Sequence, residues 1–159
     1  LTAEGTAFIT RRRRHEWRHV YELARRVRPA LQGGIGWLRP LDTSLFRPSI
    51  WRSIADWFTM NDTERLVVRA PDSDDLQAVL WVQRKFAAGH LRLTLISNPD
   101  YPVSASEHLL QHVLRRYPGS GFVIEHPQDD EDTAQLLRRY HFRPSRTVWH
   151  MRWDVKSGL

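Results

Sequence analysis

A loop of small residues leads into a helix near the middle of the chain, and its residue types suit the binding of an anion. The loop is Tyr101-Pro102-Val103-Ser104-Ala105-Ser106 and follows the turn residues Asn98-Pro99-Asp100. Backbone N–H groups at a helix start have no partner within the helix, and the helix dipole adds positive potential there. Such a start binds anions readily. The alternative is that Ser104 or Ser106 is only the N-cap of the helix.

Two periodic segments flank this loop and would hold it in place. Before it, Leu91 to Ile96 combines apolar residues with a β-branched threonine, which is typical of a half-buried strand. After it, from Glu107 onward, apolar residues recur with the spacing of one helix face; they are Leu109, Leu110, Val113, Leu114 and Tyr117. The stretch from His90 to Tyr117 is therefore predicted to be a strand, a loop and an amphipathic helix.

The composition limits the class of protein. The 159 residues, of which 41% are hydrophobic, suit one domain with a real core. The chain has no cysteine, which excludes a thiol nucleophile, a thiolate metal site and a disulfide framework. No apolar run reaches the length of a membrane span, and no leader pattern opens the sequence. We expect a cytoplasmic protein that does not act at a membrane.

We expect a single domain over residues 1–159, with a core of about 6–155. Because the first residue is Leu1, a trimmed N-terminus or a piece of a longer or tandem protein is an open alternative.

Almost all of the positive charge comes from arginine. The formal net charge is +6, and the two lysines are Lys85 and Lys156. Arginine binds phosphate and carboxylate as a fork, so one interpretation is an anionic partner, either nucleic acid or a phosphorylated cofactor. The other interpretation is a bias in residue usage, which the scatter of arginines along the chain favours.

The remaining segments complete an alternation of strands and helices. Strands are predicted at 6–10, 64–70, 76–86, 122–125 and 147–155, and helices at 17–27, from about 48 to 58, and at 134–143. The acidic run Asp129–Asp132 would complement the positive end of the last helix. The order is β-α-α-β-β-β-α-β-α-β. It predicts an α/β (α+β) fold with a mixed, mostly antiparallel sheet flanked by helices.

This order resembles that of the GNAT superfamily of N-acetyltransferases, over roughly Thr6 to Val155. The segments that carry the resemblance are Phe8–Arg12 with Glu16-Trp17, the hairpin Arg65–Arg84, the strand Leu91–Ile96, the helix from Glu107 and the junction Tyr140–Arg143. At this junction His141 stands where the family usually has glycine.

The resemblance implies acetyl-CoA as co-substrate and no metal. In the family, the pantetheine chain lies along the central strand in a gap beside the next strand, and backbone N–H groups at the central helix hold the pyrophosphate. The residues that would face the pantetheine are Leu95, Ile96 and Ser97, and those that would cradle the pyrophosphate are Tyr101, Val103, Ser104, Ala105 and Ser106. An amine would then attack the thioester directly.

The pyrophosphate loop is a degenerate form of the family's motif. The family has Arg or Gln, two residues, Gly, one residue, and Gly or Ala, where this sequence has Tyr101, Ser104 and Ser106. The position of the tyrosine that often serves the family as general acid is Leu137, and Tyr140 is only a weak substitute. The catalytic residues are therefore unassigned.

Three further polar side chains are weighed as catalytic groups. Glu125 and His126 end a strand beside the expected gap and are candidates for a general base, and each also suits a purely structural role. His150 is expected to be exposed on an edge strand.

Two functions are consistent with these features. The first is an acetyl-CoA-dependent N-acetyltransferase whose acceptor is an unidentified primary amine, on a small molecule or a peptide. The alternative is a GNAT-like domain that has lost catalysis and binds a ligand or a protein. An open gap between the central strands favours the first, and a gap plugged by side chains such as Tyr101 or Trp149 favours the second. Nucleic-acid binding is the weakest hypothesis because no reader motif is present, and a homodimer is left open.

Overall fold

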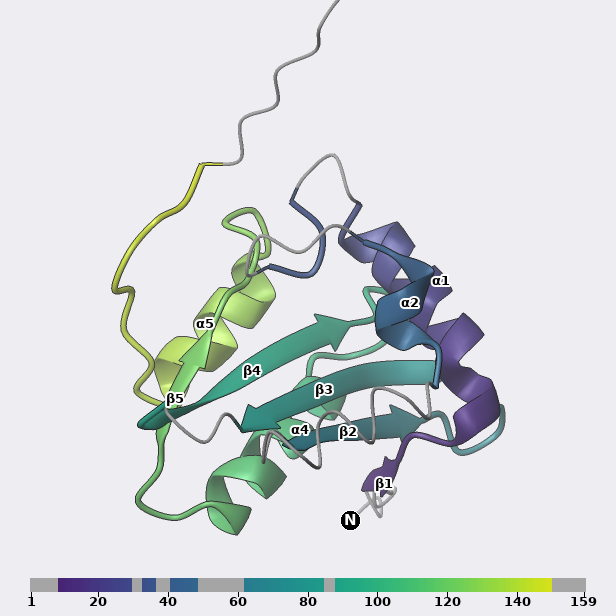
Figure 1. Ribbon diagram of the computed structural model, residues 1–159, viewed down its shortest axis with the longest axis horizontal. Helices are drawn as coiled ribbons and strands as arrows, with labels where there is room; N and C mark the ends of the chain where they lie inside the picture. The colour runs from purple at the N-terminus through teal and green to yellow at the C-terminus, as the bar shows by residue number, and fades with distance from the viewer. Residues whose placement is uncertain (1–8, 30–32, 37–40, 49–61, 85–87, 150–159) are drawn as a thin grey trace, which may run out of the picture.

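Five strands form one sheet in the computed structural model, which describes residues 9–29, 33–36, 41–48, 62–84 and 88–149. In sheet order they are β1 (Ile9–Arg11), β2 (Asp62–Arg69), β3 (Leu76–Arg84), β4 (His90–Ser97) and β5 (Gly121–Ile124). Neighbouring strands are antiparallel except β4 and β5, which run parallel. The prediction of a mixed, mostly antiparallel sheet is confirmed (Figure 1).

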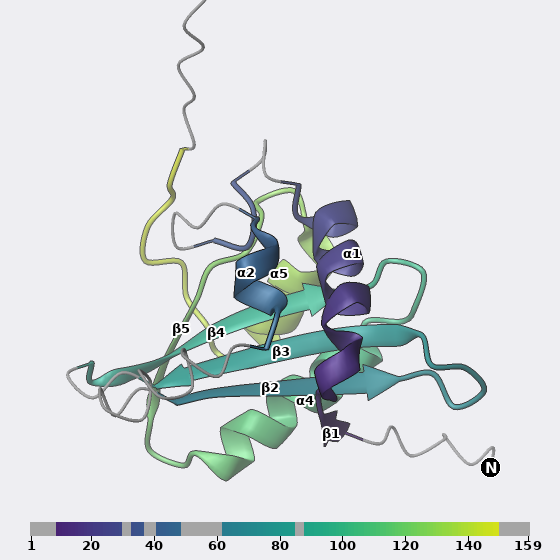
Figure 2. The ribbon, with the colours of Figure 1, turned by 45° about the vertical axis from the view of Figure 1, so that its right-hand side comes forward.

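Helices cover both faces of the sheet (Figures 1 and 2). One face carries α1 (Trp17–Val27), preceded by the 3-10 turn η1 (Arg14–Glu16), together with α2 (Thr43–Phe46). The other face carries α4 (Ser104–Arg116) and α5 (Glu131–Arg139). A separate apolar core fills each side, so β3 and β4 are buried on both faces.

The alternation of side chains along β4 connects the two cores. Leu93 and Leu95 point into the core beneath α4 and α5, whereas Ile96 points into the core beneath α1. All three are fully buried. Because both faces are covered, residues 91 and 93–96 of β4 are buried, and the polar Thr94 is among them.

A buried ion pair fixes the start of α1. Glu16 is only 3% exposed, and Arg69 on β2 forms an ion pair with it, in which Arg69 Nε donates to Glu16 Oε1 at 2.7 Å. The same carboxylate accepts from the Arg13 backbone N–H. In the arginine run 11–14, Arg12 Nη1 donates to the Phe46 carbonyl at 2.7 Å, which holds α2 beside β1. Most of the run is exposed.

Three predictions at the ends of elements need correction. The central helix begins at Ser104 rather than at Glu107. The last helix spans Glu131–Arg139 rather than residues 134–143. The predicted terminal strand is wrong for residues 147–149, which belong to no strand, and of which Val148 and Trp149 are exposed. Alternating apolar residues indicate a segment that is suited to a sheet. A strand forms only where the edge strand of a sheet is also available for pairing. The rest of that strand, His150 included, and the helix predicted from about 48 to 58 lie outside the described residues.

The ends of α5 follow local rules. At its start, Asp130 is the N-cap and accepts the Thr133 N–H at 3.0 Å, so the predicted helix-start role of the acidic run is confirmed. At its end, the His141 N–H donates to the Arg138 carbonyl and the Phe142 N–H to the Leu137 carbonyl, each at 3.0 Å. These two bonds form a Schellman motif.

His141 therefore occupies the left-handed position at which such a motif usually has glycine. Its φ is 63°, and it is the one non-glycine residue with positive φ in the described part of the chain. Replacing it by glycine should raise the free energy of unfolding by about 0.5–1 kcal/mol, because glycine relieves the Cβ clash but is freer in the unfolded chain. Urea denaturation measures this. A β-branched replacement, His141→Val, should lower the stability, and a His141→Gly variant less stable than the wild type would contradict the assignment.

Candidate functional site

The gap expected between the central strands is present, because β5 is shorter than β4. The parallel pairing runs from His90–Gly121 to Leu93–Ile124 and ends there. Strand β4 continues to Ser97, which leaves its last four residues, 94–97, without a strand partner on that side in the described chain. The start of α4 follows seven residues after the end of β4, at Ser104.

The register of β4 determines which backbone groups face this gap. The Asn98 N–H donates to the Gln77 carbonyl at 2.9 Å, on the side of β3. In an antiparallel pair, bonding to the partner strand alternates from residue to residue. The backbone of Ile96 is therefore turned toward β3, and that of Leu95 and Ser97 toward the gap.

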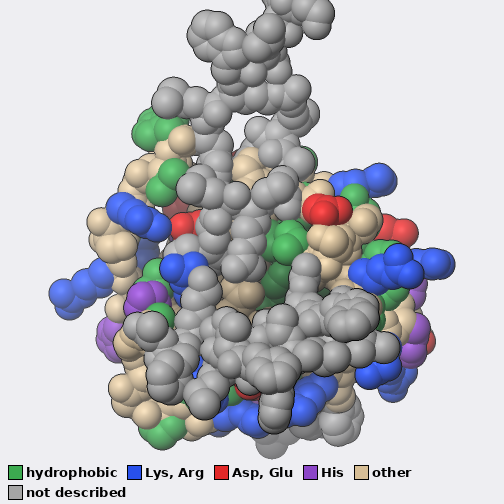
Figure 3. All heavy atoms as spheres, viewed as in Figure 1, with side chains coloured by type: hydrophobic (Ala, Val, Ile, Leu, Met, Phe, Trp, Pro, Cys, Tyr) green, Lys and Arg blue, Asp and Glu red, His purple; other side chains and the backbone are tan. Residues whose placement is uncertain are grey.

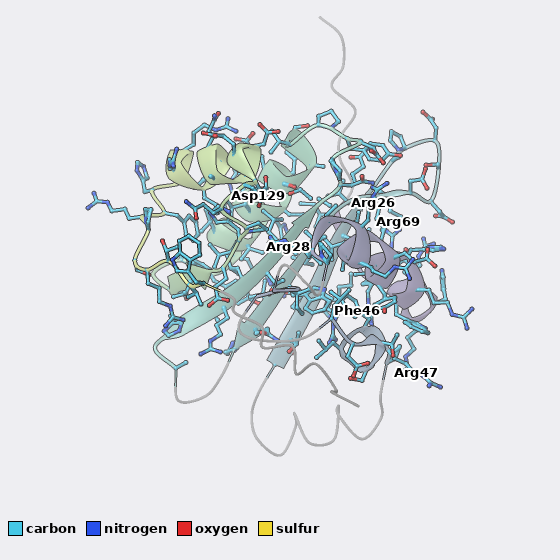
Figure 4. All side chains as sticks on the ribbon, turned by 90° about the horizontal axis from the view of Figure 1, so that it is seen from above. Arg26, Arg28, Phe46, Arg47, Arg69 and Asp129 are labelled. Atoms are coloured by element: carbon cyan, nitrogen blue, oxygen red, sulfur yellow. The ribbon has the colours of Figure 1, made fainter. Side chains whose placement is uncertain are left out.

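A side chain from α1 already occupies the Leu95 carbonyl. Arg28 Nη2 donates to this oxygen at 2.8 Å, in a buried hydrogen bond. Arg28 is the C-cap residue of α1 and is only 5% exposed (Figure 4). Its neighbour on the helix, Arg26, binds the Asn98 and Asp100 side chains in the loop that follows β4. The end of α1 is thus tied to the end of β4 at two points.

Burial shapes the charge of Arg28. Desolvation lowers the pKa of its guanidinium from 12.5 to about 10, and the carboxylates of Asp130 and Asp129 act in the opposite direction. At this pKa the side chain keeps its positive charge at neutral pH.

Sequence reasoning missed Arg28. Its only local signal is its place before the helix-ending Pro29, which predicts a helix boundary and nothing about burial.

The start of α4 presents free backbone donors. The Ala105 N–H donates to the Pro102 carbonyl at 3.3 Å and the Glu107 N–H to the Val103 carbonyl at 3.0 Å. Within the described residues, the N–H groups of Ser104 and Ser106 have no backbone acceptor. The N-cap is Val103, which has no capping side chain, so the alternative in which a serine caps the helix is wrong.

Three hydroxyl side chains join the two helix starts to β4. The hydroxyls of Ser97 and Ser106 lie 2.8 Å apart, and those of Ser97 and Thr133 lie 3.4 Å apart. Ser106 and Thr133 are each only 1% exposed. The Ser106 side chain is therefore turned inward to β4, whereas Ser104 lies exposed at the helix start.

Neither side chain named as a plug of the gap fills that role. The Tyr101 hydroxyl donates to Asp75 in the turn between β2 and β3, at 3.2 Å. Trp149 is 82% exposed. Among the residues that the structure describes, the group seated on the gap-facing backbone is Arg28.

The two candidates for a general base lie just beyond β5 in different surroundings. Glu125 accepts from Arg146 Nη2 at 3.4 Å and packs against Gly36, whose φ is +84° and where an added Cβ would lie 3.0 Å from Glu125 Oε2. His126 has a buried Nδ1 with no hydrogen-bond partner in the described chain. Burial first, and the positive charge of Arg28 second, lower the pKa of His126. Its imidazole is thus neutral at pH 7, as a base must be.

Neither Tyr140 nor the residue at position 137 provides a general acid at the gap. The Tyr140 hydroxyl donates to Glu107 Oε1 at 2.9 Å and accepts from Gln111 Nε2 at 2.5 Å, so it is bound to the side of α4. Leu137 is buried in the core beneath α4 and α5.

Outside this region the described residues offer little. A pocket at the opposite edge of the sheet is lined by Arg11, Arg12 and the first residues of β2, and it contains none of the predicted site residues. No group of three or more His, Asp or Glu side chains that could hold a metal occurs in the described ranges. None of the helices described there is long and apolar enough to cross a membrane. On the face in Figure 3, the coloured Arg side chains lie apart around the rim.

The fold is that of the GNAT acetyltransferases. Glucosamine-6-phosphate N-acetyltransferase from Arabidopsis thaliana is 12% identical, with a TM-score of 0.56 over 94% of this chain and 99% of that chain. An acetyltransferase from Trypanosoma brucei is 14% identical, with a TM-score of 0.52 over 93% and 99%. An acetyltransferase of the GNAT family from Bacillus anthracis is 10% identical, with a TM-score of 0.52 over 89% and 84%. No protein-family model and no curated protein matches the sequence.

The lowered pKa of His126 predicts a particular dependence of stability on pH. Because the folded-state pKa lies below the ordinary 6.5, the unfolded chain takes up this proton first as the pH falls. The contribution of His126 to stability is therefore complete above pH 6.5 and is lost as the pH falls toward the folded-state pKa.

Urea midpoints between pH 7.5 and 5.5 should fall more steeply for the wild type than for His126→Gln. His108→Gln, at an exposed position of α4, is the control for loss of a histidine. Parallel pH curves for the wild type and His126→Gln would contradict the assignment.

Proposed function

We propose that this chain is an acetyl-CoA-dependent N-acetyltransferase that acetylates a primary amine. The observation that carries the proposal is the position of the gap between β4 and β5. The backbones of Leu95 and Ser97 face it, and the free N–H groups of Ser104 and Ser106 lie at the helix start that follows. The GNAT acetyltransferase fold supports this use of the gap.

The chain's own groups suit the two parts of the cofactor. The pantetheine arm carries amides, which can pair with the gap-facing backbone of Leu95 and Ser97 in the manner of an added strand. The start of α4 offers N–H donors and the positive end of the helix dipole to the pyrophosphate. The loop from Tyr101 to Ser106 lacks glycine, so its side chains could crowd the pyrophosphate. The Ser106 side chain avoids this because it is turned to Ser97.

The reaction needs a neutral amine held beside the thioester. The amine nitrogen forms a bond to the acetyl carbon, the carbon–sulfur bond breaks, and the thiolate leaves and takes up a proton. The proton lost by the amine needs a base, and His126 is our candidate because its lowered pKa keeps it neutral. Among the solved structures of this fold is one named for an amino-sugar phosphate, which supports a small-molecule amine as acceptor.

One observation favours the alternative, a GNAT-like domain without catalysis. Arg28 donates to the Leu95 carbonyl, the same oxygen that a pantetheine amide would use. Acetyl-CoA must therefore displace this hydrogen bond in order to bind.

Calorimetric titration of acetyl-CoA decides between the two. We expect one-to-one binding that Ser104→Glu weakens about tenfold, because a carboxylate at the helix start repels the pyrophosphate. Ser104→Gln, of the same size and without the charge, should bind nearly as the wild type does.

Ser104→Glu should also raise the stability slightly, by about 0.3–1 kcal/mol, since a negative charge complements the helix start. This shows that the variant is folded. Absence of binding at millimolar acetyl-CoA would reject the transferase in favour of the non-catalytic domain.

A further inference from the structure

Arg28 is a buried cation without a bonded anion. It is only 5% exposed, and its one hydrogen-bond acceptor among the described residues is the neutral Leu95 carbonyl. No carboxylate of the described chain forms an ion pair with Arg28, whereas Arg69, whose side chain is 13% exposed, is paired with Glu16. Buried charges in proteins are normally paired, because an isolated one carries a large desolvation cost.

The nearby acidic residues do not form an ion pair with the buried charge of Arg28. Asp130 and Asp129 act on Arg28 through space. The Asp130 carboxylate is committed to the start of α5, where it accepts the Thr133 N–H at 3.0 Å. Asp129 is exposed to solvent, and Figure 4 shows it beside the start of α5. Together they stabilise the charge without binding the guanidinium.

Most of the hydrogen-bond donors of Arg28 have no acceptor among the described residues. A guanidinium has five N–H donors, and one hydrogen bond leaves most of them unused. No nitrogen of Arg28 is among the side-chain atoms that are both sealed from solvent and without a hydrogen-bond partner in the described chain.

We propose that Arg28 binds an anionic group, a carboxylate or a phosphate, on the amine that the enzyme acetylates. This inference rests on the proposed function and names the class of acceptor. The fork of a guanidinium matches the paired oxygens of either anion. Its hydrogen bond to Leu95 places Arg28 at the level of the gap that the thioester end of the cofactor would reach. An anionic group on the amine forms a stronger hydrogen bond with the guanidinium than a neutral carbonyl does. Binding of such an amine therefore frees the Leu95 carbonyl oxygen.

Binding of inorganic phosphate tests the anion site directly. Thermal midpoints are measured in phosphate, acetate and chloride at equal ionic strength. We expect phosphate or acetate, and not chloride, to raise the midpoint of the wild type. Arg28→Met should weaken this binding about tenfold or more, and Arg28→Lys, which keeps the charge and loses the fork, should retain part of it.

Arg26→Met is the matched control, because Arg26 lies on the same helix end and is paired with Asp100. It should respond to phosphate as the wild type does. An equal phosphate response in the wild type and Arg28→Met, or no response in the wild type to either anion, would overturn the proposal.

A panel of three small amines tests the acceptor class and the source of the anion. Glycine carries a carboxylate, phosphoethanolamine a phosphate, and ethanolamine neither. We expect one of the anionic amines to have a KM at least tenfold below that of ethanolamine, and Arg28→Met to raise that KM with a smaller change in kcat. Equal KM values for all three would overturn the assignment. An anion response that depends on Arg28 in a protein that fails to bind acetyl-CoA would support the anion site and reject the transferase.

Discussion

The early end of β5 is the constraint on which the site depends. Strand β5 has four residues and β4 has eight, so the parallel pairing stops at Leu93–Ile124 while β4 continues. The continuing residues keep the register that β3 imposes, which turns the backbone of Leu95 and Ser97 outward. The hydroxyl contacts of Ser97 with Ser106 and Thr133 then bring the starts of α4 and α5 to the same strand end.

Much of the fold follows from patterns within short segments. Apolar spacing predicts α1 and its end before Pro29, and strand patterns with a turn predict β2, β3 and β4. The acidic residue at the start of α5 follows from the chemistry of caps. Whether a segment pairs with a sheet edge depends on residues far along the chain. For that reason the prediction of a terminal strand is wrong at residues 147–149. The gap itself follows from the resemblance to GNAT acetyltransferases, because no pattern in the sequence shows where two parallel strands part.

The burial of Arg28 beside the gap could not be predicted from the sequence, and it affects which ligands the site can bind. Arginine is among the residues least often buried, so a sequence gives no reason to place one between two helical layers. Its surroundings come from residues far along the chain: the Leu95 carbonyl accepts its hydrogen bond, and the carboxylates before α5 act on its charge through space. The same hydrogen bond occupies the gap-facing Leu95 carbonyl and uses only one of the guanidinium donors, so both candidate functions depend on whether a ligand releases it.

Amide NMR of the labelled protein during a titration with acetyl-CoA tests the central claim most directly. If the gap is the cofactor site, the largest shifts should occur at Leu95, Ser97, Ser104 and Ser106. The Arg28 Nε–H signal should also move, because the bond from Nη2 of the same guanidinium to the Leu95 carbonyl is replaced. Shifts confined to the opposite edge of the sheet, at β1 and β2, or no shifts at saturating acetyl-CoA, would contradict the assignment of this gap as the functional site.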